Sequence, residues 1–248
     1  MRRDVLDLRQ FYAGALGGAA REMVTRKVGE AWGGLSGLDL LAFGYATPFL
    51  EPLAAGARRT IAAMPAQQGV EAWPLGAPND AVLVDETALP FPSAFFDRVL
   101  AAHALEEADS PREVLTELAR VLAPSGRLIV VVAARHGLWA NAESSPFGHG
   151  RPFSRRQLEA LVREADLEPA GWTRALYAPP LAWAARWAEG FEQAGARLWP
   201  PMAGLILMEA QKLTLAVRPI AVRQRVRVFA AGALRPARAP HGARSLGG

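Results

Sequence analysis

Short apolar runs alternate with amphipathic stretches along most of the chain. The runs are continuous rather than mixed with polar residues, which is typical of strands buried on both faces of a sheet. We expect such strands at 38–43, 60–64, 81–84, 98–102, 127–134 and 203–210. The stretches between them place apolar residues at helical spacing. The alternation predicts a mostly parallel sheet with helices on both faces.

Two of the expected helices have strong start signals. Ser110 precedes Pro111, which suits the first helical position, and Glu113 completes a capping box with Ser110. Ser154 and Gln157 form a second capping box before another apolar stripe. These signals predict helices that begin at 111 and 155.

Glycine and proline divide the chain into parts. The first stretch is helical in pattern but contains glycines, which predicts two short helices. Proline pairs enclose a helical insertion that carries Trp183 and Trp187, which either cover an acceptor or dock a partner. The predicted parts are an N-terminal helical lid at 1–34, a main domain at 35–217 with its insertion at about 179–201, and a basic, disordered tail at 218–248.

Composition narrows the class of protein. Of the 248 residues, 51% are hydrophobic, which is enough for a large core. The chain has no cysteine, so disulfides, thiolate metal sites and cysteine nucleophiles are excluded, and we expect no metal site. We find no signal peptide and no apolar run long enough to span a bilayer, so a cytoplasmic protein is expected.

The positive charge belongs to the end of the chain. No acidic residue follows Glu209, which leaves 20 of the 28 basic residues against all 24 acidic residues in the rest of the chain. An arginine-rich tail can contact nucleic acid, anionic lipid or an acidic partner. A solvated arm without a partner explains it too, and we favour that interpretation. Val222–Val228 alternates valine and arginine, which also suits a short extra strand.

The middle of the chain carries a familiar pattern. It reads Asp85-x-x-x-Leu89-Pro90-Phe91, then Phe96-Asp97-x-Val99, then Glu117-x-x-Arg120-Val121-Leu122-x-Pro124-x-Gly126-x-Leu128. This pattern resembles the class I S-adenosylmethionine-dependent methyltransferases of the type 11-like family. The resemblance implies an α/β fold, a Rossmann-like three-layer sandwich with a mostly parallel seven-stranded sheet, N-terminal helices and a helical insertion.

The resemblance also implies a cofactor site for S-adenosylmethionine, with changed motifs. The family has an acid and a glycine-rich turn after the first strand, where this chain has Ala42 and then Gly44-Tyr45-Ala46-Thr47-Pro48. Met64 stands where the family has the acid that holds the ribose. The implied cofactor residues are Tyr12, Gly44, Tyr45, Ala46, Met64, Asp85, Glu86 and His103.

Several of these residues have a simpler structural explanation. His103 follows the fourth strand, where the family places its reaction zone, so it is our catalytic candidate; a histidine that only packs at a strand end fits as well. Asp85 either binds the adenine amino group or caps its own loop. Tyr12 either belongs to a lid over the cofactor or packs between helices.

The loop after the fifth strand is the candidate acceptor site, because ligands of such sheets bind beyond the carboxyl ends of the strands. Its residues Arg135, Trp139, His149 and Arg151 are the substrate-binding candidates. Either arginine would hold an anionic group. A loop fixed on the sheet by Trp139 and Phe153, with Arg151 bonded to backbone carbonyls, is equally consistent with the sequence.

Three functions follow. The first is methyl transfer from S-adenosylmethionine by direct displacement to an unknown acceptor, a reaction that needs alignment rather than a protein nucleophile. The second is a cofactor-poor pseudoenzyme that acts as a scaffold or regulatory subunit for a protein partner, which the changes at Ala42, Ala46, Pro48 and Met64 favour. The third, a nucleic-acid methyltransferase guided by the tail, is disfavoured because no Asn-Pro-Pro-Tyr type motif follows the fourth strand.

Overall fold

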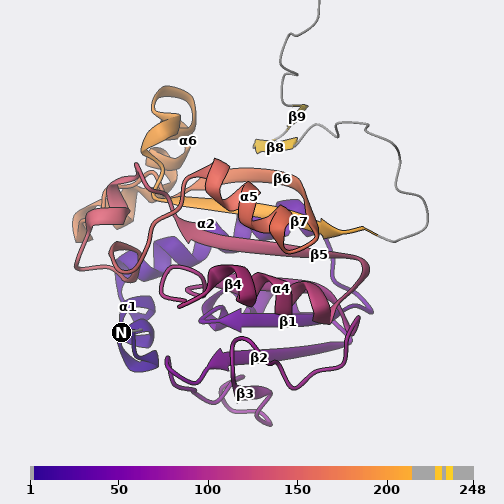
Figure 1. Cartoon of the computed structure of the whole chain (residues 1–248). Coiled ribbons are helices and arrows are strands. Elements are labelled where there is room, and N and C mark those ends of the chain that lie inside the picture. Colours follow the sequence, from indigo (N-terminus) through magenta and orange to yellow (C-terminus); the bar gives the residue numbers. More distant parts are fainter. Residues whose placement is uncertain (1–2, 214–226, 231–232, 237–248) are drawn as a thin grey trace, which may run out of the picture.

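The computed structural model describes residues 3–213, 227–230 and 233–236. Within these ranges the chain forms a nine-stranded sheet with helices on both faces (Figure 1). The strand order is β3-β2-β1-β4-β5-β7-β6-β8-β9. Strands β1 to β5 are parallel, and β7 lies antiparallel between β5 and β6. The first seven strands therefore confirm the mostly parallel sheet expected from the sequence.

Strands β1 to β5 and β7 lie close to the apolar runs that predicted them, whereas β6, β8 and β9 were not among those runs. Their bounds are β1 Asp39–Gly44, β2 Arg59–Pro65, β3 Ala81–Val84, β4 Phe96–Ala102, β5 Leu122–Ala133, β6 Leu167–Ala175, β7 Leu205–Lys212, β8 Arg227–Ala230 and β9 Ala233–Pro236.

The helices fill the segments between the strands. Their bounds are α1 Val5–Ala13, α2 Ala15–Trp32, α3 Glu51–Ala54, α4 Pro111–Val121, α5 Arg155–Glu164 and α6 Ala188–Leu198, with short 3-10 helices at η1 Thr47–Phe49, η2 Leu138–Asn141, η3 Pro146–Gly148, η4 Ala182–Trp187 and η5 Pro200–Met202. In the described ranges, no helix combines the length and the apolar character that crossing a membrane requires.

Each central strand contributes side chains to two cores. Leu41 and Phe43 of β1 pack in the cluster that contains the apolar faces of α4 and α5. Leu40 and Ala42 pack in the cluster that contains those of α1 and α2. The same alternation runs through β4 and β5. Because both faces are covered, no position on these strands needs to be polar, which explains the continuous apolar runs.

The capping box predicted at Ser154 forms in full, and at Ser110 the bond to the serine hydroxyl is the half that is present. The Ser154 hydroxyl accepts from the Gln157 backbone N–H, and the Gln157 side chain accepts from the Ser154 backbone N–H, which completes the capping box of α5. The Ser110 hydroxyl accepts from the Glu113 N–H at the start of α4. These contacts satisfy backbone donors that have no partner within the helix.

The N-terminal segment forms the two helices expected, and α1 ends at Gly14. Gly17 lies in the first turn of α2, and a Cβ there would overlap the carbonyl oxygen of Phe11. A glycine at 17 therefore lets α2 fold back closely against α1. This sharp turn directs α1 toward the carboxyl ends of β1 and β4.

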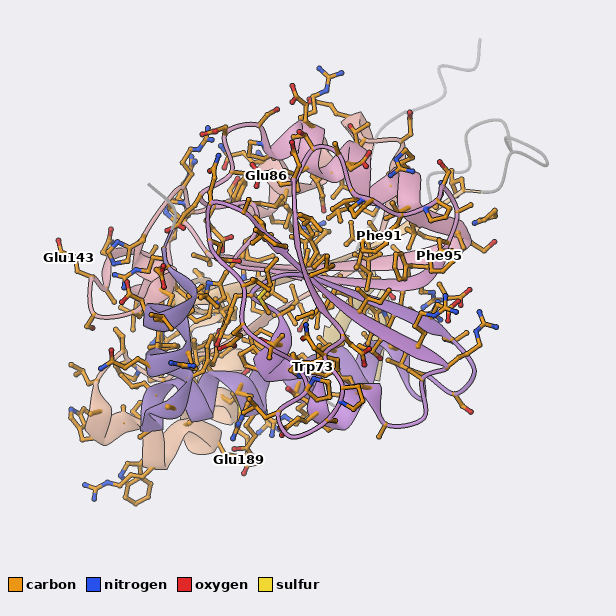
Figure 2. The ribbon with its side chains drawn as sticks, turned by 90° about the horizontal axis from the view of Figure 1, so that it is seen from below. Trp73, Glu86, Phe91, Phe95, Glu143 and Glu189 are labelled. Atoms are coloured by element: carbon orange, nitrogen blue, oxygen red, sulfur yellow. The ribbon has the colours of Figure 1, made fainter. Side chains whose placement is uncertain are left out.

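The helical insertion stands away from the sheet (Figure 1). Trp183 and Trp187 are 54% and 61% exposed, so neither ring covers a buried site. Glu192 of α6 is buried and accepts hydrogen bonds from the backbone N–H groups of Leu176 and Tyr177, at 3.0 and 3.2 Å. This carboxylate fixes the insertion to the end of β6. Figure 2 shows Glu189, on the same helix, at the periphery of the molecule.

Two described ranges of the basic tail form strands where disorder was expected. β8 pairs with β6 at Gly171 and Trp172, and β9 pairs with β8. The strand suggested by the valine–arginine alternation thus begins at Arg227, and residues 222–226 lie outside the described ranges. Pairing with the open edge of β6 explains the difference, since an edge strand can bind any segment with extended backbone.

Glu117 and Arg120 hold the loop between β3 and β4. The Arg120 guanidinium bonds to both oxygens of Glu117, at 2.7 and 2.9 Å, and donates to the carbonyl oxygens of Leu89 and Phe91. Glu117 also accepts from the Leu89 backbone N–H at 2.7 Å. Phe91 and Phe95, labelled in Figure 2, belong to this loop. The spaced Glu-x-x-Arg pattern therefore has a structural role, which is to fix the Leu-Pro-Phe segment after β3.

We expect Arg120→Met to lower the free energy of unfolding by about 2–3 kcal/mol, because it removes charge-assisted bonds and leaves the half-buried Glu117 carboxylate without its cation. Arg112→Met on the same helix is the matched control. The Arg112 side chain is 67% exposed and makes a single long ion pair, 3.9 Å from Nε to Glu164 Oε2. Its loss should lower the free energy of unfolding by less than about 0.5 kcal/mol. Urea unfolding of both variants measures the difference. Equal losses would show that the loop does not depend on Arg120.

Candidate functional site

The turn after β1 brings the backbone of two strands into contact. Gly44 has φ +76°, and a Cβ there would overlap the carbonyl oxygen of Ala102 at the end of β4. The Tyr45 backbone N–H donates to the same oxygen at 2.9 Å. Both the positive φ and the close approach require glycine at position 44. The turn therefore keeps the first glycine of the expected motif for a physical reason.

The other replacements in this turn are accommodated without strain. Ala46 is fully buried with φ −97°, a conformation open to any L-residue. Pro48 lies in the first turn of η1, where its missing N–H costs nothing. Met64, near the end of β2, is fully buried in the core shared with α1 and α2. In this position its side chain is a packing residue.

His103 and Tyr12 form a buried pair at the end of β4. The Tyr12 hydroxyl lies 2.7 Å from His103 Nε2, and the imidazole packs against the Phe147 ring at 4.6 Å between centroids. Burial, reinforced by the positive charge of Arg3, lowers the pKa of His103 to about 3. Burial also raises the pKa of Tyr12 well above its usual value. Both side chains are therefore neutral at physiological pH.

An aromatic cluster surrounds this pair. Tyr12 also contacts the rings of Phe49 and Tyr45, at 5.5 and 5.9 Å, and Phe11 beside it contacts Trp139. Burial, followed by a hydrogen bond from Tyr45 to Glu71, raises the pKa of the Tyr45 phenol. The cluster joins α1, the turn after β1 and the loop after β5 in one packed unit.

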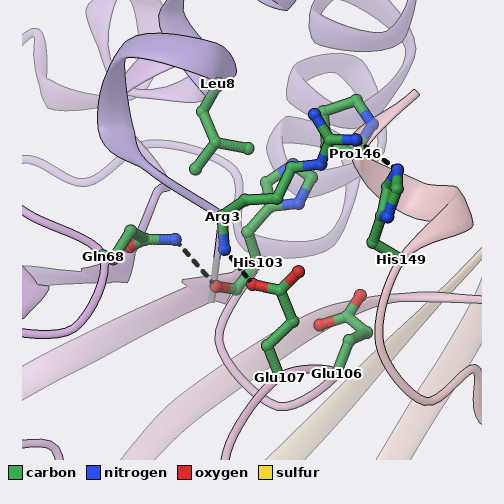
Figure 3. A pocket seen from close by; sticks show the side chains of 8 residues that line it. All are labelled: Arg3, Leu8, Gln68, His103, Glu106, Glu107, Pro146 and His149. Carbon is green, nitrogen blue, oxygen red and sulfur yellow. Dashed lines mark hydrogen bonds between the residues drawn. The ribbon is translucent and has the colours of Figure 1, made fainter. Parts of the chain in front are cut away.

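Only a small cavity lies beside His103. Its volume is about 10 Å³, which is room for roughly one water molecule. Figure 3 shows Arg3 crossing this space, where its backbone N–H donates to Glu107 at 2.6 Å and its side chain contacts His149. Gln68 donates to the carbonyl oxygen of His103 at 3.2 Å. The N-terminal segment thus closes the end of β4.

Asp85 and Glu86 lie outside this cavity, in the loop after β3 (Glu86 is labelled in Figure 2). Asp85 is exposed, and its Oδ1 accepts from the Thr87 backbone N–H and hydroxyl, at 2.9 and 2.8 Å. These bonds lower the pKa of Asp85. The carboxylate caps its own loop in this conformation.

The four acceptor-site candidates separate in space. His149 lines the cavity beside His103, whereas Arg135 lines a different groove. Trp139 is fully buried and its indole N–H donates to the carbonyl oxygen of Ala178 at 2.7 Å. Arg151 donates to the carbonyl oxygens of Ala108 and Asp109, at 2.6 and 3.4 Å. Trp139 and Arg151 hold the loop in place. Of the four candidates, His149 is the one that lines the same cavity as His103.

Some residues of this region were not singled out from the sequence. Arg3, Gln68, Glu106 and Glu107 all line the cavity. Glu106 is buried and accepts from the Ala133 backbone N–H at 3.0 Å. The sequence could have indicated Glu106 as a residue of this region, because it follows His103 by three positions beyond the carboxyl end of β4. Arg3 has no comparable sequence signal. Over the described ranges, no group of three or more potential ligands could hold a metal ion.

Among the residues that the structure describes, the space beside His103 is too small for S-adenosylmethionine in this conformation. Gly44 keeps the positive φ of a tight turn, and Tyr12 packs against the adjoining Tyr45 and Phe49. Pockets for ligands of this size have volumes of roughly 300–1,000 Å³, and the cavity beside His103 has about 10 Å³. A bound cofactor would require α1 to move away from β4.

Residues 43–130 match the family model of a methyltransferase domain. Over 92 residues the chain is 38% identical to the 27-O-demethylrifamycin SV methyltransferase of Amycolatopsis mediterranei; the match covers 34% of each protein. It is 43% identical over 51 residues to the ubiquinone/menaquinone biosynthesis C-methyltransferase of Bordetella parapertussis, covering 21% of this chain and 20% of the relative. The sequence matches thus span about a third or less of these relatives.

Solved structures resemble the fold more completely. A SAM-dependent methyltransferase of Thermotoga maritima superposes with a TM-score of 0.58 at 19% identity, covering 84% of this chain and 96% of its own. A Haloferax volcanii methyltransferase, solved with the Trm112 methyltransferase activator, has a TM-score of 0.59 at 20% identity, covering 86% and 100%. The [4+2]-cyclase SpnF is also similar, with a TM-score of 0.53 at 22% identity, covering 77% and 80%.

The cyclase shows that this fold also occurs in a protein named for a different reaction, so the fold alone does not define the chemistry. The strand order, the Gly44 turn and the match over residues 43–130 agree with one another. The chain has the class I methyltransferase fold, and its residues 43–130 match the family model of a methyltransferase domain.

Proposed function

We propose that this protein is a methyltransferase that uses S-adenosylmethionine and transfers the methyl group by direct displacement to an acceptor still to be identified. When bound, the cofactor would supply an electrophilic sulfonium methyl. The observation that carries the proposal is the Gly44 turn, whose positive φ and contact with Ala102 preserve the close backbone approach that such sites use. Tyr12, Gly44, Tyr45, Ala46, Met64, Asp85 and Glu86 remain the candidate cofactor residues.

His103 has a role that depends on the position of α1. In the closed arrangement its pKa of about 3 makes it too weak a base to accept a proton near neutral pH. Movement of α1 would expose the imidazole and return its pKa toward the ordinary value near 6.5. His103 would then accept a proton from an acceptor aligned at the end of β4. Of the predicted acceptor residues Arg135, Trp139, His149 and Arg151, His149 lies at the same cavity as His103 and would position an acceptor there; the other three stay predictions.

The alternative is a pseudo-methyltransferase that serves as a scaffold or regulatory subunit. The closed cavity of about 10 Å³ and the buried Met64 at the ribose position favour it. The exposed rings of Trp183 and Trp187 offer a surface for a protein partner. The Haloferax volcanii structure, a complex with an activator protein, shows that a protein of this fold can bind a partner.

Calorimetric titration of the full chain with S-adenosylmethionine and S-adenosylhomocysteine separates the two functions. Binding with a dissociation constant in the micromolar range supports the enzyme, since binding of that strength, about −8 kcal/mol, requires a built site. Absence of heat at millimolar concentrations of both compounds rules out the cofactor site and favours the scaffold.

Asp85→Asn tests the family's assignment of the adenine site. An asparagine Oδ1 can still accept the bonds from Thr87, so the loop should keep its shape. We expect S-adenosylhomocysteine binding to weaken by about five-fold or more, because a charge-assisted bond is lost. Asp80→Asn, an exposed substitution in the segment before β3, is the matched control and should change binding by less than about two-fold. Unchanged affinity in Asp85→Asn would remove Asp85 from the site.

The buried His103 should make stability depend on pH. Its folded pKa of about 3 lies below the unfolded value near 6.5, so the unfolded state binds the proton first and stability falls as the pH decreases below 6.5. Between pH 6.5 and 5 the loss should be about 2 kcal/mol. His103→Asn, which tolerates the φ of +49° and does not titrate, should lose correspondingly less. Urea unfolding at pH 7.5 and 5 measures this; parallel losses would contradict a neutral, buried His103.

A further inference from the structure

A second groove lies at the same edge of the sheet, separate from the His103 cavity. It is bounded by the segment after β5, the first turn of α5, the end of β6 and the start of β7. Its volume is about 430 Å³, which is within the range of sites for small organic ligands. Figure 1 shows α5 lying beside β6 and β7. The groove is therefore large enough to be a binding site in the conformation described.

Positive charge dominates the groove. Its charged and titratable lining residues are Arg135, His136, Arg155, Arg156, Glu159 and Arg174. Glu159 is the one carboxylate among them, and it bonds to Arg155 at 2.7 Å. In the part of the chain that the structure describes, no ion pair involves Arg135, Arg156 or Arg174. Three guanidinium groups are thus uncompensated on one concave surface.

Three of the four arginines are held in place by neighbouring groups, and the fourth, Arg156, is exposed. The guanidinium groups of Arg155 and Arg174 lie 4.4 and 5.0 Å from the centroid of the same ring, that of the buried Trp172. The Arg135 side chain donates to the carbonyl oxygen of Pro152 at 3.4 Å. Arg155 is already paired with Glu159, so the charge of Arg174 on this ring is the one that an anion in the groove would balance. Because the side chains are already ordered, less entropy is lost when such a ligand binds.

The groove also has an apolar wall. Phe153, Pro201 and Ile206 line it together with the arginines. An inorganic ion would use the charges alone, whereas an organic anion would also bury apolar surface here. Guanidinium groups bind carboxylates and phosphates with two parallel bonds, so both chemistries suit the site.

We propose that the groove between the segment after β5 and the start of α5 binds a small organic anion that carries a phosphate or carboxylate group, held by Arg135, Arg156 and Arg174 against the apolar wall. The site does not require that the chain binds S-adenosylmethionine or transfers methyl groups.

The test is a calorimetric titration of the full chain with inorganic phosphate, phenyl phosphate and benzoate. We expect one of the two organic anions to bind with a dissociation constant below about 1 mM, more tightly than inorganic phosphate and more weakly as sodium chloride is raised. A preference for phenyl phosphate or for benzoate identifies the phosphate or the carboxylate ligand. No binding by either organic anion would overturn the proposal.

Two variants and one control locate the binding. Arg174→Gln and Arg156→Gln should each lower the affinity for the preferred anion by about five-fold or more, since each removes a charge-assisted contact. Arg156 is exposed and makes no ion pair with the described residues, so this variant stays informative even if Arg174→Gln disturbs Trp172. Arg163→Gln, on the same helix but outside the groove, should change affinity by less than about two-fold. Equal effects in all three variants would contradict the assignment.

Titration of the same variants with S-adenosylhomocysteine keeps this proposal apart from the methyltransferase proposal. We expect its affinity to be unchanged in Arg156→Gln, whatever that affinity is. Loss of anion binding alone supports the groove as an independent site. A parallel loss of both ligands would show that the groove is not separate from the cofactor site.

Discussion

The hydrogen bond between Tyr12 and His103 is the contact on which the closed form of the site depends. It joins the first helix to the residue after β4, over a separation of 91 positions in the sequence. Around it, Phe49, Tyr45 and Phe147 pack against one or the other ring. Because both partners are buried and neutral, breaking the bond without a replacement would leave two polar groups unsatisfied. The helix α1 is therefore held by a specific contact as well as by apolar packing.

This contact sets the energetic terms on which a cofactor could bind. A ligand that requires α1 to move must supply the free energy of opening, and each 1.4 kcal/mol of that cost lowers its apparent affinity about tenfold. The Gly44 turn lies beneath the aromatic cluster and keeps its backbone geometry in the closed form. The enzyme and scaffold proposals differ in whether binding of S-adenosylmethionine supplies the free energy of moving α1. The enzyme proposal requires α1 to move, whereas the scaffold proposal leaves α1 closed.

Sequence patterns predicted the fold well because they reflect local physics. Continuous apolar runs indicate burial on both faces, and Ser154 with Gln157 marks a helix start through short-range hydrogen bonds. The hydrogen-bond partners of individual side chains were harder to predict from the sequence. Asp85 bonds within its own loop, and Arg151 bonds to carbonyl oxygens more than forty positions away. Both outcomes were among the alternatives, but the residue types alone cannot choose between a ligand and a backbone partner.

The cavity and the groove were still less predictable from sequence. Arg3 reaches His149 only because Gly17 turns α2 back against α1. Arg155 and Arg174 come together only because α5 packs over Trp172 of β6. Such sites arise from contacts between distant segments, for which no local spacing exists. Alanine at position 46 causes no backbone strain because its φ is negative, and the residue type alone does not specify that φ.

The direction of β7 has a consequence for the basic segment that follows it. β7 runs antiparallel to β5, so it begins opposite Ala133 and ends beside Arg127. Its last residue, Lys212, donates to the carbonyl oxygens of Ala119 and Leu122, at 2.7 and 2.8 Å, which anchors it to the end of α4. The chain thus departs from the side of the molecule remote from His103. A partner bound at Lys212 would thus lie at the opposite edge of the sheet from the His103 cavity and would leave that cavity free to meet a different molecule.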